Sequence, residues 1–432
     1  QVLKDASSAA IYGAQAANGV IIITTKKAKK GEIRVNFDMS LTAQTFTSGI
    51  DLLNTEEWAK CYWQAFQNGN NGNNPNSQLF GNGPAPVIAD TYQSGDKTMP
   101  LADTDWAKEI YSTALMQNYN LSLTRGGENG SSSLSVNYID HDGTCRNTDY
   151  KSFNTRLSGS YHFLDNRLRI GENVAVTRWT KHNNPGGIEE QLFKMMPMVP
   201  VYATDGSYGG GYVDVLNDSP NPIRLTDNEA NNKHLYWRIF GNAYVEVEPV
   251  KNLVLRSNFG LNYYNEENSV FTPSWQEGAR NVGNNELEVS NAQQYNWIWT
   301  NQVQYSIDFG KNSLTALLGV EAKREQYDFF RSYGTGLEYE DTDYRYLDAV
   351  TSGKNVGGTA SVYSMVSYFG KLNYSYDGRY LASVTVRRDA SSRFGKYNNS
   401  GIFPSVSLGR RLSREKFLSS AKGWLDDLKI RA

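Results

Sequence analysis

The chain has 432 residues, too many for one ordinary soluble core. This length indicates two or three domains or one large β structure. Its 43 basic and 45 acidic residues give a net charge of −2, so no basic excess points to nucleic acid or to a lysine-rich lipid-binding face. The longest apolar run, Val20 to Ile23, is far shorter than the ~20 residues that a membrane-spanning helix needs.

The N-terminal segment ends in a hairpin-like pattern. Asn18-Gly19 is a strong signal for a tight turn, because these residues adopt positive φ angles readily. The β-branched run from Val20 to Thr25 follows it and predicts a buried strand. Lysines then end the segment at Lys26 and Lys27.

Alternating apolar and polar residues predict a long series of β-strands after Gly31. One face of the segment near residue 300 is aromatic and aliphatic, with Trp297 and Trp299, whereas Gln302 and Gln304 lie on the other. A further strand begins at Lys429, after twelve expected strands. These cover 32–47, 116–125, 131–140, 150–163, 167–181, 234–247, 252–265, 288–309, 313–332, 358–376, 379–388 and 401–412.

The connections between these strands alternate between tight turns and longer loops. Asp377-Gly378 is one tight turn, and 48–115, 182–233 and 333–357 are the longest excursions. Outer-membrane barrels show this parity, with tight periplasmic turns and extended extracellular loops, whereas a soluble β-sandwich gives no reason for it. Aromatic residues make up 12% of the chain, and Tyr and Trp favour membrane interfaces. The pattern predicts an all-β fold, a partial transmembrane antiparallel β-barrel.

Several segments resemble one known family. The opening wording KDAS-x-A-x-IYGA-x-AANGVI-x-ITTKK is similar to the last plug hairpin of the SusC/RagA branch of TonB-dependent outer-membrane transporters. The residues of that motif singled out here are Asp5, Tyr12, Gly13, Asn18 and Gly19. The segments 104–111, 120–127, 138–149, 369–395 and 401–411 also resemble this branch. Gln15 and Arg410 depart from it, because an arginine and a tryptophan are common at these two places.

The resemblance implies a domain organisation. Residues 1–30 would be the C-terminal end of a plug domain, and 31–432 the N-terminal part of a barrel of about twelve strands. Gln1 is not an initiator methionine and no signal peptide precedes it, so we expect a chain truncated at both ends. Closed barrels of this class have 22 strands and a plugged lumen.

The resemblance also implies a function without bond chemistry. Members import glycans, or sometimes peptides, across the outer membrane of Bacteroidota-type bacteria. They work with a SusD-like surface lipoprotein and draw energy from TonB–ExbB–ExbD through an N-terminal segment that this chain lacks. Two alternatives remain open at this stage: a passive porin or surface adhesin, and a soluble secreted glycan-binding protein.

Within the first long loop, Asn54 and Glu57 fit a capping box that starts a short helix. Trp58, Tyr62 and Phe66 then fall on one helix face, so they are candidates for stacking on a glycan, or for packing within the loop.

Enzymatic and metal chemistry find little support. No cofactor motif is present, and the four histidines and two cysteines, Cys61 and Cys145, lack zinc-ligand spacing. A disulfide between these cysteines remains possible. Glu189-Glu190 reads as a solvated helix face rather than a glycosidase pair. Two further alternatives stay open: a cation held by the aspartates at 140, 142 and 149, and contact of the apolar run 195–200 with either the barrel rim or the lipoprotein.

Overall fold

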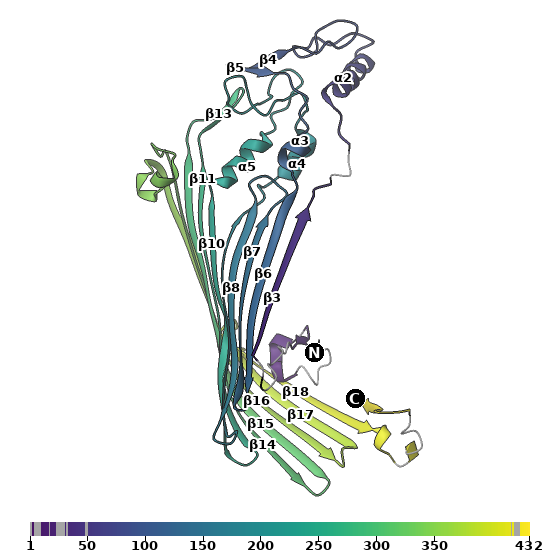
Figure 1. Cartoon of the computed structure of the whole chain (residues 1–432), viewed down its shortest axis with the longest axis vertical. Coiled ribbons are helices and arrows are strands. Elements are labelled where there is room, and N and C mark those ends of the chain that lie inside the picture. The colour runs from purple at the N-terminus through teal and green to yellow at the C-terminus, as the bar shows by residue number, and fades with distance from the viewer. Residues whose placement is uncertain are drawn as a thin grey trace.

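One large antiparallel sheet dominates the computed structural model, which describes residues 2–3, 10–16, 18–22, 31, 33–47, 51–415, 417–418 and 424–432. Thirteen strands follow one another in an up-and-down meander, and β3 and β19 form the two edges (Figure 1). The strands are β3 (Ile33–Gln44), β6 (Ala114–Gly127), β7 (Gly130–Asp142), β8 (Asp149–Phe163), β9 (Leu168–His182), β10 (Lys233–Val250), β11 (Leu253–Thr272), β14 (Glu286–Phe309), β15 (Asn312–Thr335), β16 (Ser352–Tyr376), β17 (Tyr380–Ser391), β18 (Ser400–Arg411) and β19 (Lys429–Arg431). The twelve predicted strands and the start of a thirteenth are confirmed.

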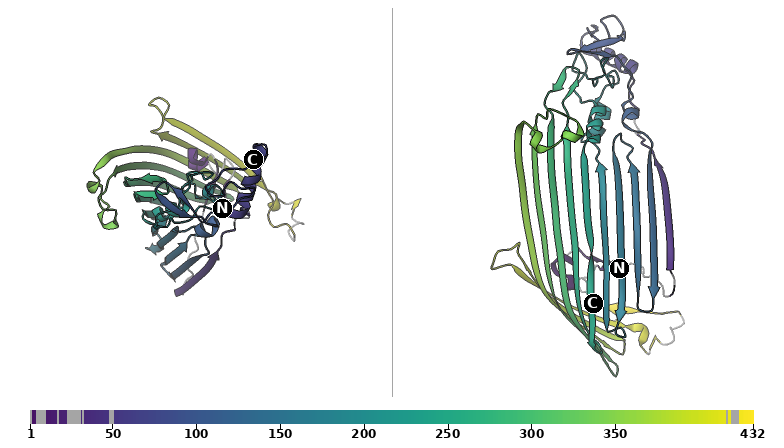
Figure 2. Two further views of the ribbon diagram at one scale, coloured as in Figure 1. Left: turned by 90° about the horizontal axis from the view of Figure 1, so that it is seen from above. Right: turned by 60° about the vertical axis from the view of Figure 1, so that its left-hand side comes forward.

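The sheet curves into an open trough whose strands have unequal connections at the two ends (Figure 2). At one end the links are tight, such as residues 251–252, 310–311 and 377–379. At the other end the longest links run over 45–113 and 183–232, with shorter ones at 273–285 and 336–351. The predicted parity of turns and loops is confirmed up to β18, whereas the link from β18 to β19 (412–428) lies at the end with the tight turns and is long.

The pairing register gives the sheet one apolar and one polar face. Directly opposed residues of antiparallel strands share a face, so Glu246, Arg256 and Gln302 lie in one row. Trp299 is displaced by one residue from Thr300, points the other way, and is 48% exposed. The predicted apolar series on β14 lies on the Trp299 face and comprises Tyr295, Trp297, Val303, Tyr305, Ile307 and Phe309.

Several strands are longer than the sequence indicates. β15 continues to Thr335 and β16 starts at Ser352, so the loop predicted at 333–357 shrinks to 336–351. β11 extends to Thr272 and β17 to Ser391, beyond the predicted ends at 265 and 388. At ~3.3 Å per residue, the 24 residues of β14 span about 80 Å, and a strand needs only about 10 residues to cross a bilayer. The residues of β14 outside the bilayer need not alternate between apolar and polar side chains, because both faces of the strand meet polar surroundings there.

The N-terminal segment forms a small unit of its own. β1 (Val2–Leu3) pairs with β2 (Val20–Ile21), and the 3-10 helix η1 (Ala10–Ala16) lies between them in sequence. The turn predicted at Asn18-Gly19 is confirmed, since Gly19 has a φ of 90° and donates its N–H to the Ala16 carbonyl over 2.9 Å. The prediction of a buried strand is wrong for Ile21, which is 72% exposed because a two-stranded ribbon covers little of its own surface. Thr24 and Thr25 lie outside the described residues.

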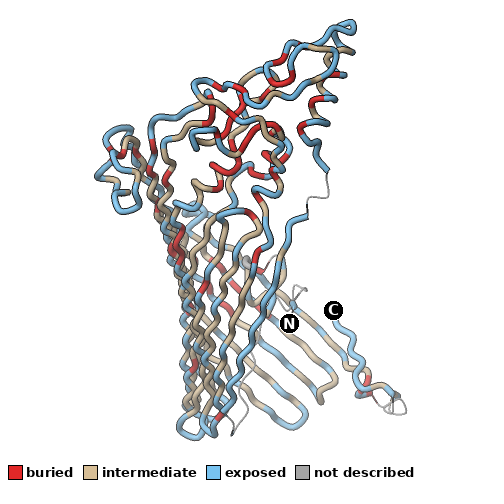
Figure 3. Tube along the Cα trace, turned by 45° about the horizontal axis from the view of Figure 1, so that its top comes forward, coloured by how far each residue is buried: buried red, intermediate tan, exposed pale blue. Residues whose placement is uncertain are grey.

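The long loops fold together beyond one end of the strands into a unit here called the loop cap (residues 51–113, 183–232 and 273–285) (Figure 1). It contains α2 (Thr55–Gly69), β4 (Thr91–Ser94), β5 (Lys97–Pro100), α3 (Trp106–Ile110), α4 (Ile188–Lys194), α5 (Pro222–Ala230), β12 (Trp275–Glu277) and β13 (Arg280–Val282). The buried residues of the chain concentrate there (Figure 3), and the core includes Leu79, Phe80, Met99, Ile188, Met198 and Ile223. Among the described residues, no helix combines the length and apolar character needed to cross a membrane.

Candidate functional site

The polar face of the sheet carries several charged residues beside the predicted Gln302. Glu246 accepts hydrogen bonds from Arg169 at 2.5 Å and from Arg256 at 3.2 Å. Gln302 lies opposite Arg256. By the two-residue period of a strand, Arg238 and Asp308 share this face with the predicted Gln304.

The N-terminal segment docks on this polar face through a buried arginine. Arg387 on β17 is 2% exposed and donates from Nε to Asp389 over 2.6 Å and from Nη2 to Glu321 over 2.7 Å. Its Nη1 donates to the Ile11 carbonyl of η1 over 2.8 Å. One guanidinium therefore holds two carboxylates of the wall and the backbone of the segment that lies against it. Substitution of a buried arginine that makes all of these hydrogen bonds is expected to be destabilising, because its partners are then left without their counterpart.

Gly13 allows the close approach. Its backbone has φ 59° and ψ −141°, a region that residues with a side chain rarely adopt. A Cβ at this position would lie 2.6 Å from Arg387 Nε and would also collide with Asp389. Of the other motif residues, Tyr12 is 40% exposed, Asn18 and Gly19 form the turn, and Asp5 lies outside the described residues.

Sequence reasoning missed Arg387, Asp389 and Glu321. Asp389 was assigned to a loop, but it belongs to β17. The available signal was the spacing Arg387-x-Asp389, which places two opposite charges on one face of a strand. Glu321 comes from β15 and has no local signal, because the pairing partner of a strand is not encoded in its own sequence.

The aromatic candidates lie on α2 as expected. Asn54 caps this helix, and the predicted capping box with Glu57 is present. The rings of Trp58 and Tyr62 are 5.5 Å apart, and Phe66 follows at 6.1 Å from Tyr62. Trp58 and Tyr62 also pack against the cap core. All three rings keep partly exposed surface, so contact with a ligand stays a prediction.

The remaining sequence candidates make ordinary structural contacts. Glu189 and Glu190 occupy the first turn of α4, where Glu190 pairs with Lys194. The apolar run 195–200 packs into the cap core rather than on the sheet rim. Asp140 pairs with Lys151. Among the described residues no group of three metal-ligating side chains gathers, and Cys61 and Cys145 are both free thiols.

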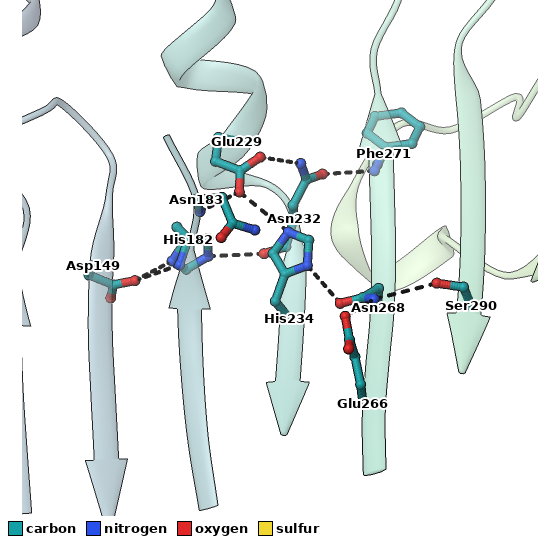
Figure 4. Close-up of polar contacts among 10 residues, drawn as sticks. All are labelled: Asp149, His182, Asn183, Glu229, Asn232, His234, Glu266, Asn268, Phe271 and Ser290. Carbon is teal, nitrogen blue, oxygen red and sulfur yellow. Dashed lines mark hydrogen bonds and ion pairs between the residues drawn. The ribbon is translucent and has the colours of Figure 1, made fainter. Parts of the chain in front are cut away.

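A polar network fastens the loop cap to the rim of the sheet (Figure 4). His182 Nδ1 lies 2.6 Å from Asp149 Oδ1, and its Nε2 lies 2.9 Å from the Asn232 carbonyl oxygen. His234 Nε2 lies 3.3 Å from Glu229 Oε1 at the C-terminal part of α5, and its Nδ1 lies 2.7 Å from the Asn268 side-chain oxygen. The network joins α5 and the residues that follow it to β8, β9, β10 and β11.

Glu229 is the centre of this network. Asn183 donates its backbone N–H to Glu229 over 2.6 Å, and Asn232 donates its side-chain amide over 2.8 Å. Burial opposes the charge on Glu229, but the nearby His234 imidazole and the hydrogen bonds from Asn232 and Asn183 outweigh it and hold the pKa of Glu229 below its usual value. A carboxylate with a lowered pKa stabilises the folded state above its unfolded pKa, and the contribution is lost as the pH falls through the folded pKa.

Glu229→Gln is therefore expected to loosen the cap by about 1–3 kcal/mol at neutral pH, because it removes a charge-assisted acceptor. The buried Cys145 thiol reports opening of the cap, in a Cys61→Ser background. We expect 4,4′-dithiodipyridine to modify Cys145 faster in the variant at pH 7. In the parent protein the rate should rise only as the pH falls below about 4.3. Glu190→Gln, on the exposed face of α4, is the matched control. Equal rates for the two variants would contradict the role of Glu229.

Comparison with known proteins relates the whole chain to one group. No family model matches the chain. TonB-dependent receptor P3 of Formosa agariphila is 28% identical over 433 residues, which cover 98% of this chain and 40% of the relative. TonB-dependent receptor SusC of Bacteroides thetaiotaomicron is 29% identical over 456 residues, which cover 100% and 42%. A solved structure of the RagAB peptide importer in the open-open state has a similar fold, with a TM-score of 0.80 at 23% identity. The match covers 100% of this chain and 49% of the importer chain.

The chain is thus similar over its whole length to TonB-dependent receptors, SusC among them, and in fold to the RagAB importer. The open sheet accordingly has the fold of one part of a β-barrel. This SusC-like chain spans about 40% of the length of the curated relatives described above. These relatives are named as receptors and the structural neighbour as an importer.

Proposed function

We propose that this SusC-like chain forms part of an outer-membrane importer driven by TonB. One observation carries the proposal: the polar, lumen-facing side of the barrel wall holds the N-terminal segment through Arg387, Glu321 and Asp389. A segment fixed inside the lumen suits a gated importer, in which the blocking segment has to move before cargo passes. Residues 1–30 would then end the plug domain, and 31–432 would form the first part of the barrel.

Cargo and partners follow from the same proposal. SusC is a TonB-dependent receptor and RagAB a peptide importer, so we propose oligosaccharides or peptides as the cargo of this chain. The loop cap would lie outside the cell, where a SusD-like lipoprotein closes over the barrel. TonB–ExbB–ExbD would act from the periplasm. The membrane would be the outer membrane of a Bacteroidota-type bacterium.

Uptake in cells tests this function. In the native bacterium, deletion of the gene should abolish uptake of one fluorescently labelled oligosaccharide or peptide pool, and deletion of the TonB gene should have the same effect. Uptake that survives loss of TonB but not loss of this gene would favour a passive porin. Release of the protein from membranes without detergent would favour the soluble alternative.

The turn at Asn18-Gly19 provides a second check on the plug assignment. Replacement by Val-Val forces a β-branched residue into the φ of 90° found at Gly19, at a cost of roughly 1–3 kcal/mol. We expect less folded protein in outer-membrane preparations, measured by heat-modifiable mobility on gels. Asn74→Val in the tip of the first loop serves as the control. An unchanged yield of the Val-Val variant would count against a structural role for this hairpin.

A further inference from the structure

The loop cap contains a cavity of about 340 Å³ between α5, the turn at 202–208 and the segment that leads into β12. Tyr202, Tyr208 and Trp275 supply aromatic rings to its lining, and Arg224 and Asp227 supply charges. Pockets that bind small molecules commonly combine such apolar walls with a few fixed polar groups. None of these residues belongs to the lumen wall or to the docking site of the N-terminal segment.

Arg224 is the decisive group in this cavity. It is 5% exposed, its Nε donates to Glu277, and its guanidinium lies 4.0 Å from the centre of the Trp275 ring. Among the described residues, neither terminal nitrogen of Arg224 donates a hydrogen bond to a protein group. A guanidinium has five N–H donors, so four remain for whatever occupies the cavity. Two terminal nitrogens side by side suit an anion that is held end-on by both of them.

The carboxylates nearby do not use these four donors. Asp227 accepts hydrogen bonds from Arg146 at 3.1 Å, Asn147 at 2.8 Å and the Tyr208 hydroxyl at 3.1 Å. Glu277 bonds only the Nε of Arg224, so the two terminal nitrogens remain for a ligand. The Arg280 guanidinium, 5.8 Å from the centre of the same Trp275 ring, adds a second cation near the cavity.

The aromatic rings indicate the rest of the ligand. Tyr202 is 45% exposed, and its ring lies 5.8 Å from that of Tyr208 at an angle of 30°. The C–H face of a pyranose packs well on such exposed rings. Asn228 and Gln276 also line the cavity, and their amides can bond hydroxyl groups. An acidic peptide would find the same guanidinium but would make less use of paired rings and amides.

We propose that this cavity binds one anionic sugar residue, with its carboxylate or sulfate on Arg224 and its pyranose face on Tyr202. The inference rests on the proposed function, because an importer with its loop cap outside the cell meets extracellular saccharides there. It narrows the proposed cargo to acidic glycans.

Saturation-transfer NMR on the native protein, purified in detergent, tests the site. The probes are D-glucuronate, glucose 6-sulfate and D-glucose. We expect both anionic sugars to bind roughly tenfold more tightly than glucose, because a charge-assisted bidentate contact is lost with the neutral sugar. Arg224→Lys keeps the charge next to Glu277 but loses the fork, so it should abolish that preference. Tyr202→Ala should weaken binding of both anionic sugars, whereas Tyr212→Ala, which changes a more exposed tyrosine of the cap outside the cavity, should not.

Four results would overturn the site: equal binding of glucose, no binding of either anionic sugar, an unchanged preference in Arg224→Lys, or tighter binding of acetyl-diglutamate than of both anionic sugars. Heat-modifiable mobility shows whether each variant is folded, and Tyr202→Ala tests the site even if Arg224→Lys fails to fold. Failure here is distinct from failure of the importer function. TonB-dependent uptake with no binding in vitro refutes the cavity alone, whereas loss of membrane association refutes the function.

Discussion

Gly13→Val should release the N-terminal segment from the barrel wall. The native φ of 59° and ψ of −141° exclude a β-branched residue, and the new side chain would collide with Arg387 and Asp389. Strain of this kind costs about 3 kcal/mol or more once the clash is added. Cells with the variant should become sensitive to vancomycin, which an intact outer membrane excludes, and η1 should become accessible to protease. Gly186→Ala is the control, since nothing lies within 4 Å of its Cβ position. Equal vancomycin resistance in both strains would contradict the docking.

Arg387→Met should have a comparable effect for an electrostatic reason. It removes the donor to the Ile11 carbonyl and the cation between Glu321 and Asp389, so one partly buried and one buried carboxylate lose their countercharge. Breaking a buried ion pair in this way costs about 3–5 kcal/mol. We expect lower heat stability in detergent and faster proteolysis of η1.

The controls for Arg387→Met separate charge from packing. Arg388→Met changes the same residue type one position away, on the lipid-facing side of β17, and should be nearly silent. The triple variant Glu321→Gln, Arg387→Met, Asp389→Asn removes the stranded charges and should recover part of the stability. A triple variant no more stable than Arg387→Met would refute the electrostatic explanation.

The sequence predicts the strands of the barrel wall well, because the pattern that defines each strand lies within that strand. Lipid on one side and a polar lumen on the other impose a period of two, which is readable in Trp297 and Trp299 against Gln302 and Gln304. Turn residues such as Asp377-Gly378 mark where strands reverse. Where β11 and β15 pass beyond the bilayer, the period fades, and the predicted ends at 265 and 332 fall short.

The fold of the loop cap could not be predicted from local sequence patterns. Its core joins residues far apart in sequence, as in the ion pair of Arg224 with Glu277. The sequence offered the barrel rim or the lipoprotein as partner of the run 195–200, whereas this run packs into the cap core. Resemblance pointed to Gly13 through the motif that contains it, yet the reason for a glycine there became visible only with Arg387 and Asp389 in place. The predictions for Asp5 and for the strand residues after Ile22 stay untested, because these residues lie outside the described part of the chain.

The two-faced barrel wall is the central claim, and a cysteine scan along β14 tests it most directly. Single cysteines at 295–304, in a background with Cys61 and Cys145 replaced by serine, would carry bimane in outer-membrane vesicles that contain brominated lipid. We predict quenching by lipid at 295, 297, 299 and 303, and quenching by aqueous iodide at 296, 300, 302 and 304. Equal access of iodide to both series would contradict the account.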